Sequence, residues 1–144
     1  MEIIKNGDLV WIDIQDPQKS DIQYLKDNYH FHPLIIDELS KETLRSKVEN
    51  HDDHCYLVLH FPLFDEKERK TYPKELDFIL SKNILVTTHF AHFDVLDDFF
   101  NKIKNDSTLK AKYLINNAGY LFYHLVTNLL NFSLRELDHI KLNI

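Results

Sequence analysis

The chain has 144 residues, of which 44% are hydrophobic and 28% charged, which suits a single globular domain with a core of its own. Its net charge of −6 argues against a nucleic-acid binder, which needs a basic face for the phosphates. One cysteine, Cys55, excludes an internal disulfide and a multi-thiolate zinc site, and two glycines leave no glycine-rich phosphate loop.

The N-terminal stretch MEIIKNGDLVWIDI lacks the apolar core and cleavage site of a secretory signal. No segment reaches the roughly 20 apolar residues needed to span a bilayer. We therefore expect a soluble intracellular chain. The motifs G-x-S-x-G and H-E-x-x-H are also missing, so we expect no enzyme.

The first predicted elements are a strand and a helix. Residues 9–17, LVWIDIQDP, begin with β-favouring residues and stop at an Asp-Pro turn. Asp16 or Ser20 can cap the helix that follows, which carries Leu25 inward and ends near Asn28.

A second short helix is expected over residues 33–41, PLIIDELSK, because Pro33 suits a first helical position. Its predicted apolar stripe comprises Leu34, Ile35 and Leu39. The preceding His30 and His32 are one residue apart and offer imidazole ligands, but a zinc site needs three or four. We therefore interpret His32-Pro33 as a helix entry.

Residues 47–64, KVENHDDHCYLVLHFPLF, predict a short strand, a polar turn at residues 50–54 and a long apolar strand. The charged residues 65–74 are expected to form a loop. Residues 75–80 and 84–90 predict a hairpin whose turn places Asn83 at a positive φ.

Three helices are expected after the strands. Residues 94–104 place apolar side chains at helical spacing, and residues 106–116 predict a short helix capped by Asp106 or Ser107. The segment 118–144 predicts one long amphipathic helix, whose apolar positions are 122, 125, 126, 129, 130, 134, 137 and 140. A helix that outgrows its domain needs a partner.

These elements predict an α/β fold with a mixed sheet flanked by helices in α/β/α layers. Residues 1–117 would form this domain. Residues 118–144 would begin a long stalk-type helix.

The ordered set resembles the N-terminal cytoplasmic domain of the CorA family of magnesium transporters. The resemblance is carried by these segments: residues 11–14 (WIDI), 32–34 (HPL) with 37–38 (DE), 45–49 (RSKVE), 53–59 (DHCYLVL), 75–80 (ELDFIL) with 83–87 (NILVT), and 120–126 (YLFYHLV). The pore motif Gly-Met-Asn and the transmembrane helices of that family would lie beyond residue 144.

The resemblance implies a regulatory domain at the cytoplasmic side of the inner membrane, assembled with itself as a homopentamer. Mg²⁺ held between neighbouring domains would close the pore, since a hard cation relieves the repulsion of facing carboxylates. The ion could also be Zn²⁺ or Co²⁺. No nucleic acid and no small-molecule substrate is implied.

The resemblance also selects candidate metal ligands. Asp65 falls where family members carry an interfacial sensing carboxylate, and Glu66 is its neighbour. Their partner would lie on the later stalk. Early stalk positions that are often acidic in the family are neutral here, at Thr127, Asn128 and Asn131.

Three alternatives stay open. A metal-dependent enzyme could use the cluster His51–Cys55, although strand alternation sends His54 and Cys55 to opposite faces and favours an inert Cys55. A zinc-transporting relative of the same family is another alternative. A plain interaction module assembled through the terminal helix is a third.

Overall fold

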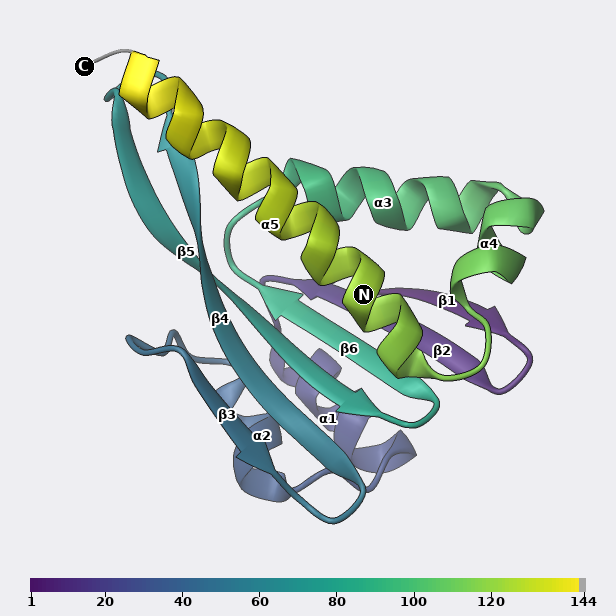
Figure 1. The fold of residues 1–144 in the computed structure, drawn as a ribbon. Helices are drawn as coiled ribbons and strands as arrows, with labels where there is room; N and C mark the ends of the chain where they lie inside the picture. Colours follow the sequence, from purple (N-terminus) through teal and green to yellow (C-terminus); the bar gives the residue numbers. More distant parts are fainter. Residues whose placement is uncertain (143–144) are drawn as a thin grey trace.

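The computed structural model describes the backbone of residues 1–142 and the side chains of residues 1–138. Residues 143–144 and the side chain of Ile140, the last position of the predicted apolar stripe, lie outside the described residues. The fold is built around one six-stranded sheet of order β1-β2-β6-β5-β4-β3 (Figure 1). The strands are β1 Glu2–Asn6, β2 Leu9–Gln15, β3 Lys47–Asn50, β4 His54–Asp65, β5 Lys70–Ser81 and β6 Ile84–His89.

The sheet is mixed, as the sequence predicted. Strands β2 and β6 pair in parallel, whereas the other neighbours are antiparallel. Strand β1 was not predicted. It is five residues long, and Gly7 at φ 59° makes the turn that returns it onto β2.

Helices cover both faces of the sheet and complete the predicted α/β/α layers (Figure 1). Helices α1 and α2 lie on one face, and α3, α4 and α5 lie on the other. Their bounds are α1 Lys19–Asn28, α2 Pro33–Glu38, α3 Asp94–Asn105, α4 Ser107–Tyr113 and α5 Ala118–Leu142.

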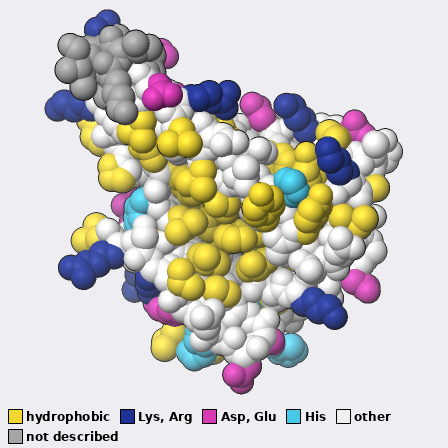
Figure 2. Space-filling model, in the orientation of Figure 1, with side chains coloured by type: hydrophobic (Ala, Val, Ile, Leu, Met, Phe, Trp, Pro, Cys, Tyr) yellow, Lys and Arg dark blue, Asp and Glu magenta, His cyan; other side chains and the backbone are white. Residues whose placement is uncertain are grey.

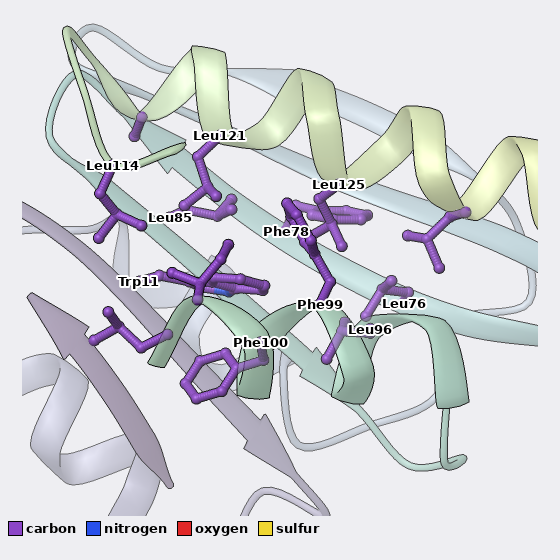
Figure 3. Packing of buried hydrophobic residues seen from close by; sticks show 14 of the residues in the cluster. Trp11, Leu76, Phe78, Leu85, Leu96, Phe99, Phe100, Leu114, Leu121 and Leu125 are labelled. Atoms are coloured by element: carbon purple, nitrogen blue, oxygen red, sulfur yellow. The ribbon is translucent and has the colours of Figure 1, made fainter. Parts of the chain in front are cut away.

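Each face carries its own core. On the α3–α5 face, Trp11 is fully buried and packs edge-on against Phe100, with ring centroids 4.7 Å apart (Figure 3). On the α1–α2 face, Ile12, Ile14 and Leu25 are fully buried.

Four local predictions were wrong. The N-cap of α1 is Gln18, which forms a capping box with Asp21, and neither Asp16 nor Ser20 caps the helix. In α2 it is Ile36 that is buried, whereas Leu34 is 67% exposed. Asn83 is not among the non-glycine residues with positive φ, which are Asp16, Arg69 and Asn116.

The fourth wrong prediction concerns the charged segment 65–74. Most of it is strand, because β4 and β5 pair continuously from His54↔Ser81 to Asp65↔Lys70. Only four residues, Glu66 to Arg69, turn the chain at the tip of this hairpin. Backbone hydrogen bonds to β4 hold the segment in the sheet although it contributes little to the core.

Helix α5 has two apolar faces. Ala118, Leu121, Leu125 and Leu129 are buried against the sheet and α3. Tyr123, Leu130, Leu134 and Leu137 form a second row on the opposite side and are 45–63% exposed; we call these four residues the outer stripe of α5. The predicted single stripe was therefore partly wrong, because its positions 130, 134 and 137 face away from the domain.

The C-terminal half of α5 runs out toward the tip of the β4–β5 hairpin (Figure 1). Hydrophobic side chains gather on the face of the molecule that carries α5 (Figure 2). Among the described helices, none has both the length and the apolarity needed to cross a bilayer.

Candidate metal site and polar clusters

Asp65 ends β4 and shapes the tip of the hairpin. Its Oδ1 accepts hydrogen bonds from the backbone N–H groups of Lys67 (2.9 Å) and Glu68 (3.2 Å). These hydrogen bonds give one oxygen of the Asp65 carboxylate a structural role in the turn. The other oxygen, Oδ2, has no hydrogen-bond partner among the described side chains.

Asp65 and Glu66 line a shallow hollow of about 880 Å³, together with Lys67, Lys74 and His92. Glu66 is exposed and also faces a second hollow of about 610 Å³ under α5. That second hollow is also lined by the charged side chains of Asp94, Arg135 and Glu136 and by the imidazole of His92. Folding thus brings Glu136 of α5 near the candidate carboxylates, and no local sequence signal pointed to it.

The two carboxylates suit a hard cation only in part. Mg²⁺ takes oxygen ligands, keeps several waters and is often held by one or two carboxylates. Asp65 and Glu66 supply that number, but nowhere in the described part of the chain do three His, Cys, Asp or Glu side chains converge on one point. Within one chain, Asp65 and Glu66 therefore provide two carboxylates, and no third such ligand converges on them among the described residues.

The histidines interpreted as a helix entry do serve that purpose. His32 is the N-cap of α2, its Nδ1 accepts from the Leu34 N–H at 3.2 Å, and Pro33 occupies the first helical position. The backbone N–H of His32 in turn donates to Nε2 of His54 at 3.2 Å. Strand β4 and the entry to α2 are therefore joined through an imidazole.

The segment His51–Cys55 does not assemble a reactive centre. His51 stacks on His54 with ring centroids 5.0 Å apart, but Cys55 lies on the other face of β4, as strand alternation predicted. Burial raises the pKa of the half-buried Cys55 thiol, which leaves less of the nucleophilic thiolate.

A buried carboxyl that the sequence analysis missed lies on the α1–α2 face. Asp77 is 2% exposed, and the Tyr56 hydroxyl donates to its Oδ2 at 2.7 Å. Burial, with the neighbouring Glu75 charge, raises the pKa of Asp77 to about 9. Its Oδ1 is buried without a hydrogen-bond partner among the described residues.

A second missed network joins β2 to β6 on the opposite face. His89 Nε2 lies 2.9 Å from Asp13 Oδ1, and its Nδ1 lies 2.7 Å from the Ala91 carbonyl oxygen. Thr87 donates to the same Asp13 oxygen at 2.6 Å and accepts from the Trp11 indole at 3.1 Å. Alternation placed Trp11 and Asp13 on one face, but only the register of β2 with β6 brings Thr87 and His89 to them.

Comparison with known proteins gives matches over most of the chain. The family model of CorA-like Mg²⁺ transporter proteins matches residues 6–144. The cobalt/magnesium transport protein CorA of Thermotoga maritima is 25% identical over 122 residues, which are 84% of this chain and 34% of that protein.

Solved structures share the fold. The soluble domain of CorA from Methanocaldococcus jannaschii has a TM-score of 0.74 at 21% identity, over 93% of this chain and 52% of that one. The cytoplasmic domain of ZntB from Vibrio parahaemolyticus has a TM-score of 0.66 at 16% identity, over 92% and 52%. The chain thus spans about a third of the Thermotoga protein and about half of each solved domain.

Proposed function

Because the chain belongs to the family of CorA-like Mg²⁺ transporter proteins, we propose that it is the cytoplasmic regulatory domain of a divalent-cation transporter. The observation that carries the proposal is the family match over residues 6–144, on a fold shared with the soluble domain of a CorA. The curated relative is a transport protein, and we propose no catalytic role for this chain.

The proposed mechanism is that Mg²⁺ between neighbouring domains favours a closed pore. Asp65 and Glu66 are the proposed ligands, and a facing subunit would complete their half-site. Removing the cation would leave facing carboxylates unneutralised, so their repulsion would favour open arrangements. The neutral Thr127, Asn128 and Asn131 of α5 add no charge to this contact.

The proposed partner is further copies of the same protein, in a homopentamer. The outer stripe of α5 supports self-association, because four exposed apolar side chains in one row lack a covering partner within the described residues. Residues 118–144 are proposed to begin the stalk through which the copies pack.

Metal sensing can be tested by the thermal stability of the chain. Millimolar MgCl₂ should raise Tm above that in NaCl of equal ionic strength, because a ligand that binds only the folded state stabilises it by mass action. At a cation concentration 100 times Kd, the gain in the free energy of unfolding is about 2.7 kcal/mol.

The double variant Asp65→Asn/Glu66→Gln should abolish this Mg²⁺-dependent rise. The matched control Glu42→Gln/Asp52→Asn removes two exposed charges away from the hairpin tip and should keep it. A rise that survives in the first double variant would exclude Asp65 and Glu66 as the ligands.

Self-association can be tested in the full-length transporter with Cys55→Ser as background. Leu134→Cys should give covalent dimers on mild oxidation, because the outer stripe would meet its counterpart on another copy. Lys112→Cys, exposed on α4, is the matched control and should stay monomeric on denaturing gels. Equal cross-linking at both positions would contradict the proposed contact.

A zinc-transporting relative is the second candidate, favoured by the fold shared with the ZntB domain. In that case Zn²⁺ at micromolar concentration should raise Tm while Mg²⁺ has no effect beyond ionic strength. The same melts, run with both cations, separate the two candidates.

A further inference from the structure

Three imidazoles lie in a row where the entry to α2 meets the β3–β4 turn. The ring of His51 stacks on that of His54 with centroids 5.0 Å apart, and it lies 4.8 Å from the ring of His32, which is tilted by 33°. His54 is 8% exposed and its ring is also contacted edge-on by Phe31. The His51 backbone N–H donates to the His54 carbonyl at 2.9 Å, which fixes the turn that presents both rings.

Two of these rings must be unprotonated at the nitrogen that makes the contact. Nε2 of His54 accepts from the His32 N–H, and Nδ1 of His32 accepts from the Leu34 N–H. A proton on either ring nitrogen would turn it from an acceptor into a donor. Two N–H donors would then face each other, and the hydrogen bond would be lost. The neutral forms satisfy both contacts, since His54 can donate from Nδ1 to Asp53 Oδ1 at 2.6 Å.

The surroundings of His51 are a second reason to expect these imidazole rings to be neutral. Its Nε2 is buried and has no hydrogen-bond partner among the described residues, and the nearest carboxylate oxygen, Glu49 Oε2, is 3.8 Å away. Two or three imidazolium rings with centroids about 5 Å apart would repel one another.

We propose that His32, His51 and His54 form a proton-operated clasp, which holds the first turn of α2 on the β3–β4 edge while neutral and releases it when protonated. Imidazole changes its charge between pH 5 and pH 8, so we expect the contact to be complete at the upper end of this range and to weaken toward its lower end.

The charges around the clasp do not remove this dependence. The Asp53 carboxylate attracts a protonated His54. The side chain of Asp53 is 75% exposed, so water screens this attraction whether the clasp is intact or released. Glu49 is already paired with Lys47 at 3.0 Å. His30 and Asp52, the other titratable groups near Asp53, are both exposed.

The release should be confined to one end of α2. At the other end, Lys47 bridges Glu38 at 2.7 Å, and no histidine takes part in this ion pair. Ile35 and Ile36 remain buried in the sheet core. We therefore expect fraying of the first turn and no loss of the helix.

Amide hydrogen exchange by NMR tests the clasp in the intact chain. The protection factors of the His32 and Leu34 amides, corrected for intrinsic rates, should fall at least tenfold between pH 7.5 and pH 5.5. The Val86 amide, in a central strand, should keep its protection over the same range.

Non-titrating acceptors provide the decisive variant. His32→Asn keeps a side-chain acceptor for the N-cap, and His54→Gln keeps one near the position of Nε2. In the double variant, the Leu34 and residue-32 amides should keep equal protection at both pH values. His30→Gln is the matched control and should respond to pH as the wild type does.

Imidazole ¹⁵N NMR of the wild type provides a readout that needs no variant. At pH 7.5, His54 should be the Nδ1–H tautomer and His32 the Nε2–H tautomer. The proposal is overturned if either ring shows the opposite tautomer, if wild-type protection is independent of pH, or if the folded double variant loses protection as the wild type does.

Discussion

At the scale of single residues, Asp77 is a carboxylic acid held neutral by its surroundings. Burial raises its pKa from the usual range to about 9, and Glu75 adds a like charge. Between about pH 4 and pH 9 the unfolded chain is therefore ionised at this position while the folded chain keeps the proton. Stability from this group is largest at low pH and falls as the pH rises through that window.

Asp77→Asn should stabilise the chain at pH 7. The amide can accept from the Tyr56 hydroxyl and donate toward Glu75, and it requires no proton uptake on folding. We expect a gain of about 1–3 kcal/mol in the free energy of unfolding, shrinking to zero near pH 4. Urea unfolding at pH 4 and pH 7 measures it, with the exposed Asp8→Asn as the control that should change little.

His89 is predicted to be an imidazolium inside the fold. Both of its ring nitrogens face acceptors, Asp13 and the Ala91 carbonyl. Burial alone would lower the pKa of His89, but the hydrogen bond and charge of Asp13 outweigh it and raise the pKa. The stability from this pair is complete below about pH 6.5, the unfolded value, and is lost as the pH rises through the raised folded pKa.

His89→Gln should cost about 3 kcal/mol at pH 6, because it removes one partner of a buried ion pair. The cost should be smaller at pH 9, where the wild type has also lost the charge. Urea unfolding at the two pH values measures both. A cost that grows with pH would contradict an imidazolium at this position.

The sequence predicted the placement of a residue correctly where one local pattern determines that placement. Strand alternation correctly separated His54 from Cys55, and His32-Pro33 correctly marked a helix entry. Asp13 and His89 are 76 positions apart, and Tyr56 and Asp77 are 21 apart. Such pairs depend on strand order and register, which no local pattern encodes.

At the scale of elements, α4 is a seven-residue helix that depends on its cap. The Asp106 carboxylate accepts from the N–H groups of Thr108 (2.8 Å) and Leu109 (3.3 Å). No residue of α4 is fully buried, although the half-buried Tyr113 packs against Phe99 with ring centroids 5.1 Å apart, so the cap matters for the first turn of this short helix. The sequence named Asp106 and Ser107 as alternative caps, and the structure has Asp106 as the cap.

Asp106→Ala should lower the free energy of unfolding by about 1 kcal/mol, the usual cost of losing an N-cap. Asp106→Asn is the matched control, because asparagine caps about as well, and should cost less than about 0.5 kcal/mol. Both variants are measured by urea unfolding. If they lower the free energy of unfolding equally, then the negative charge of Asp106, and not its capping hydrogen bonds, stabilises α4.

The elements predicted wrongly share one cause. In α2, six residues are too few for their spacing to define which side of the helix faces the sheet. The predicted apolar stripe therefore included the exposed Leu34 and left out the buried Ile36. In β5, the segment from Lys70 to Lys74 has few apolar residues and is held by pairing with β4. Both depend on a neighbouring element that the local sequence does not reveal.

At the scale of the whole molecule, α5 connects the core of the domain to its exposed side. Leu125 is fully buried, whereas Leu134 of the outer stripe is 60% exposed. The long helix itself was predicted, but the predicted stripe mixed positions from both sides. Helical periodicity finds an apolar row readily, but it does not tell which row meets the domain.

Leu125→Ala should lower the free energy of unfolding of the chain by about 2–5 kcal/mol, the range for a buried leucine. Leu134→Ala is the matched control and should change it by less than about 0.5 kcal/mol. Urea unfolding monitored at Trp11 fluorescence measures both. A large loss for Leu134→Ala would mean that the outer stripe is covered within one chain.

The parallel pairing of β2 with β6 has a consequence for biosynthesis. The N-terminal strands β1 and β2 leave the ribosome early, yet the strand that joins them to the rest of the sheet arrives more than 70 residues later. Strands β3 to β6 can pair with sequence neighbours meanwhile, since closing short loops costs less entropy. The nascent chain should therefore fold from its middle outward, leaving its first strands exposed to chaperones until translation has passed β6.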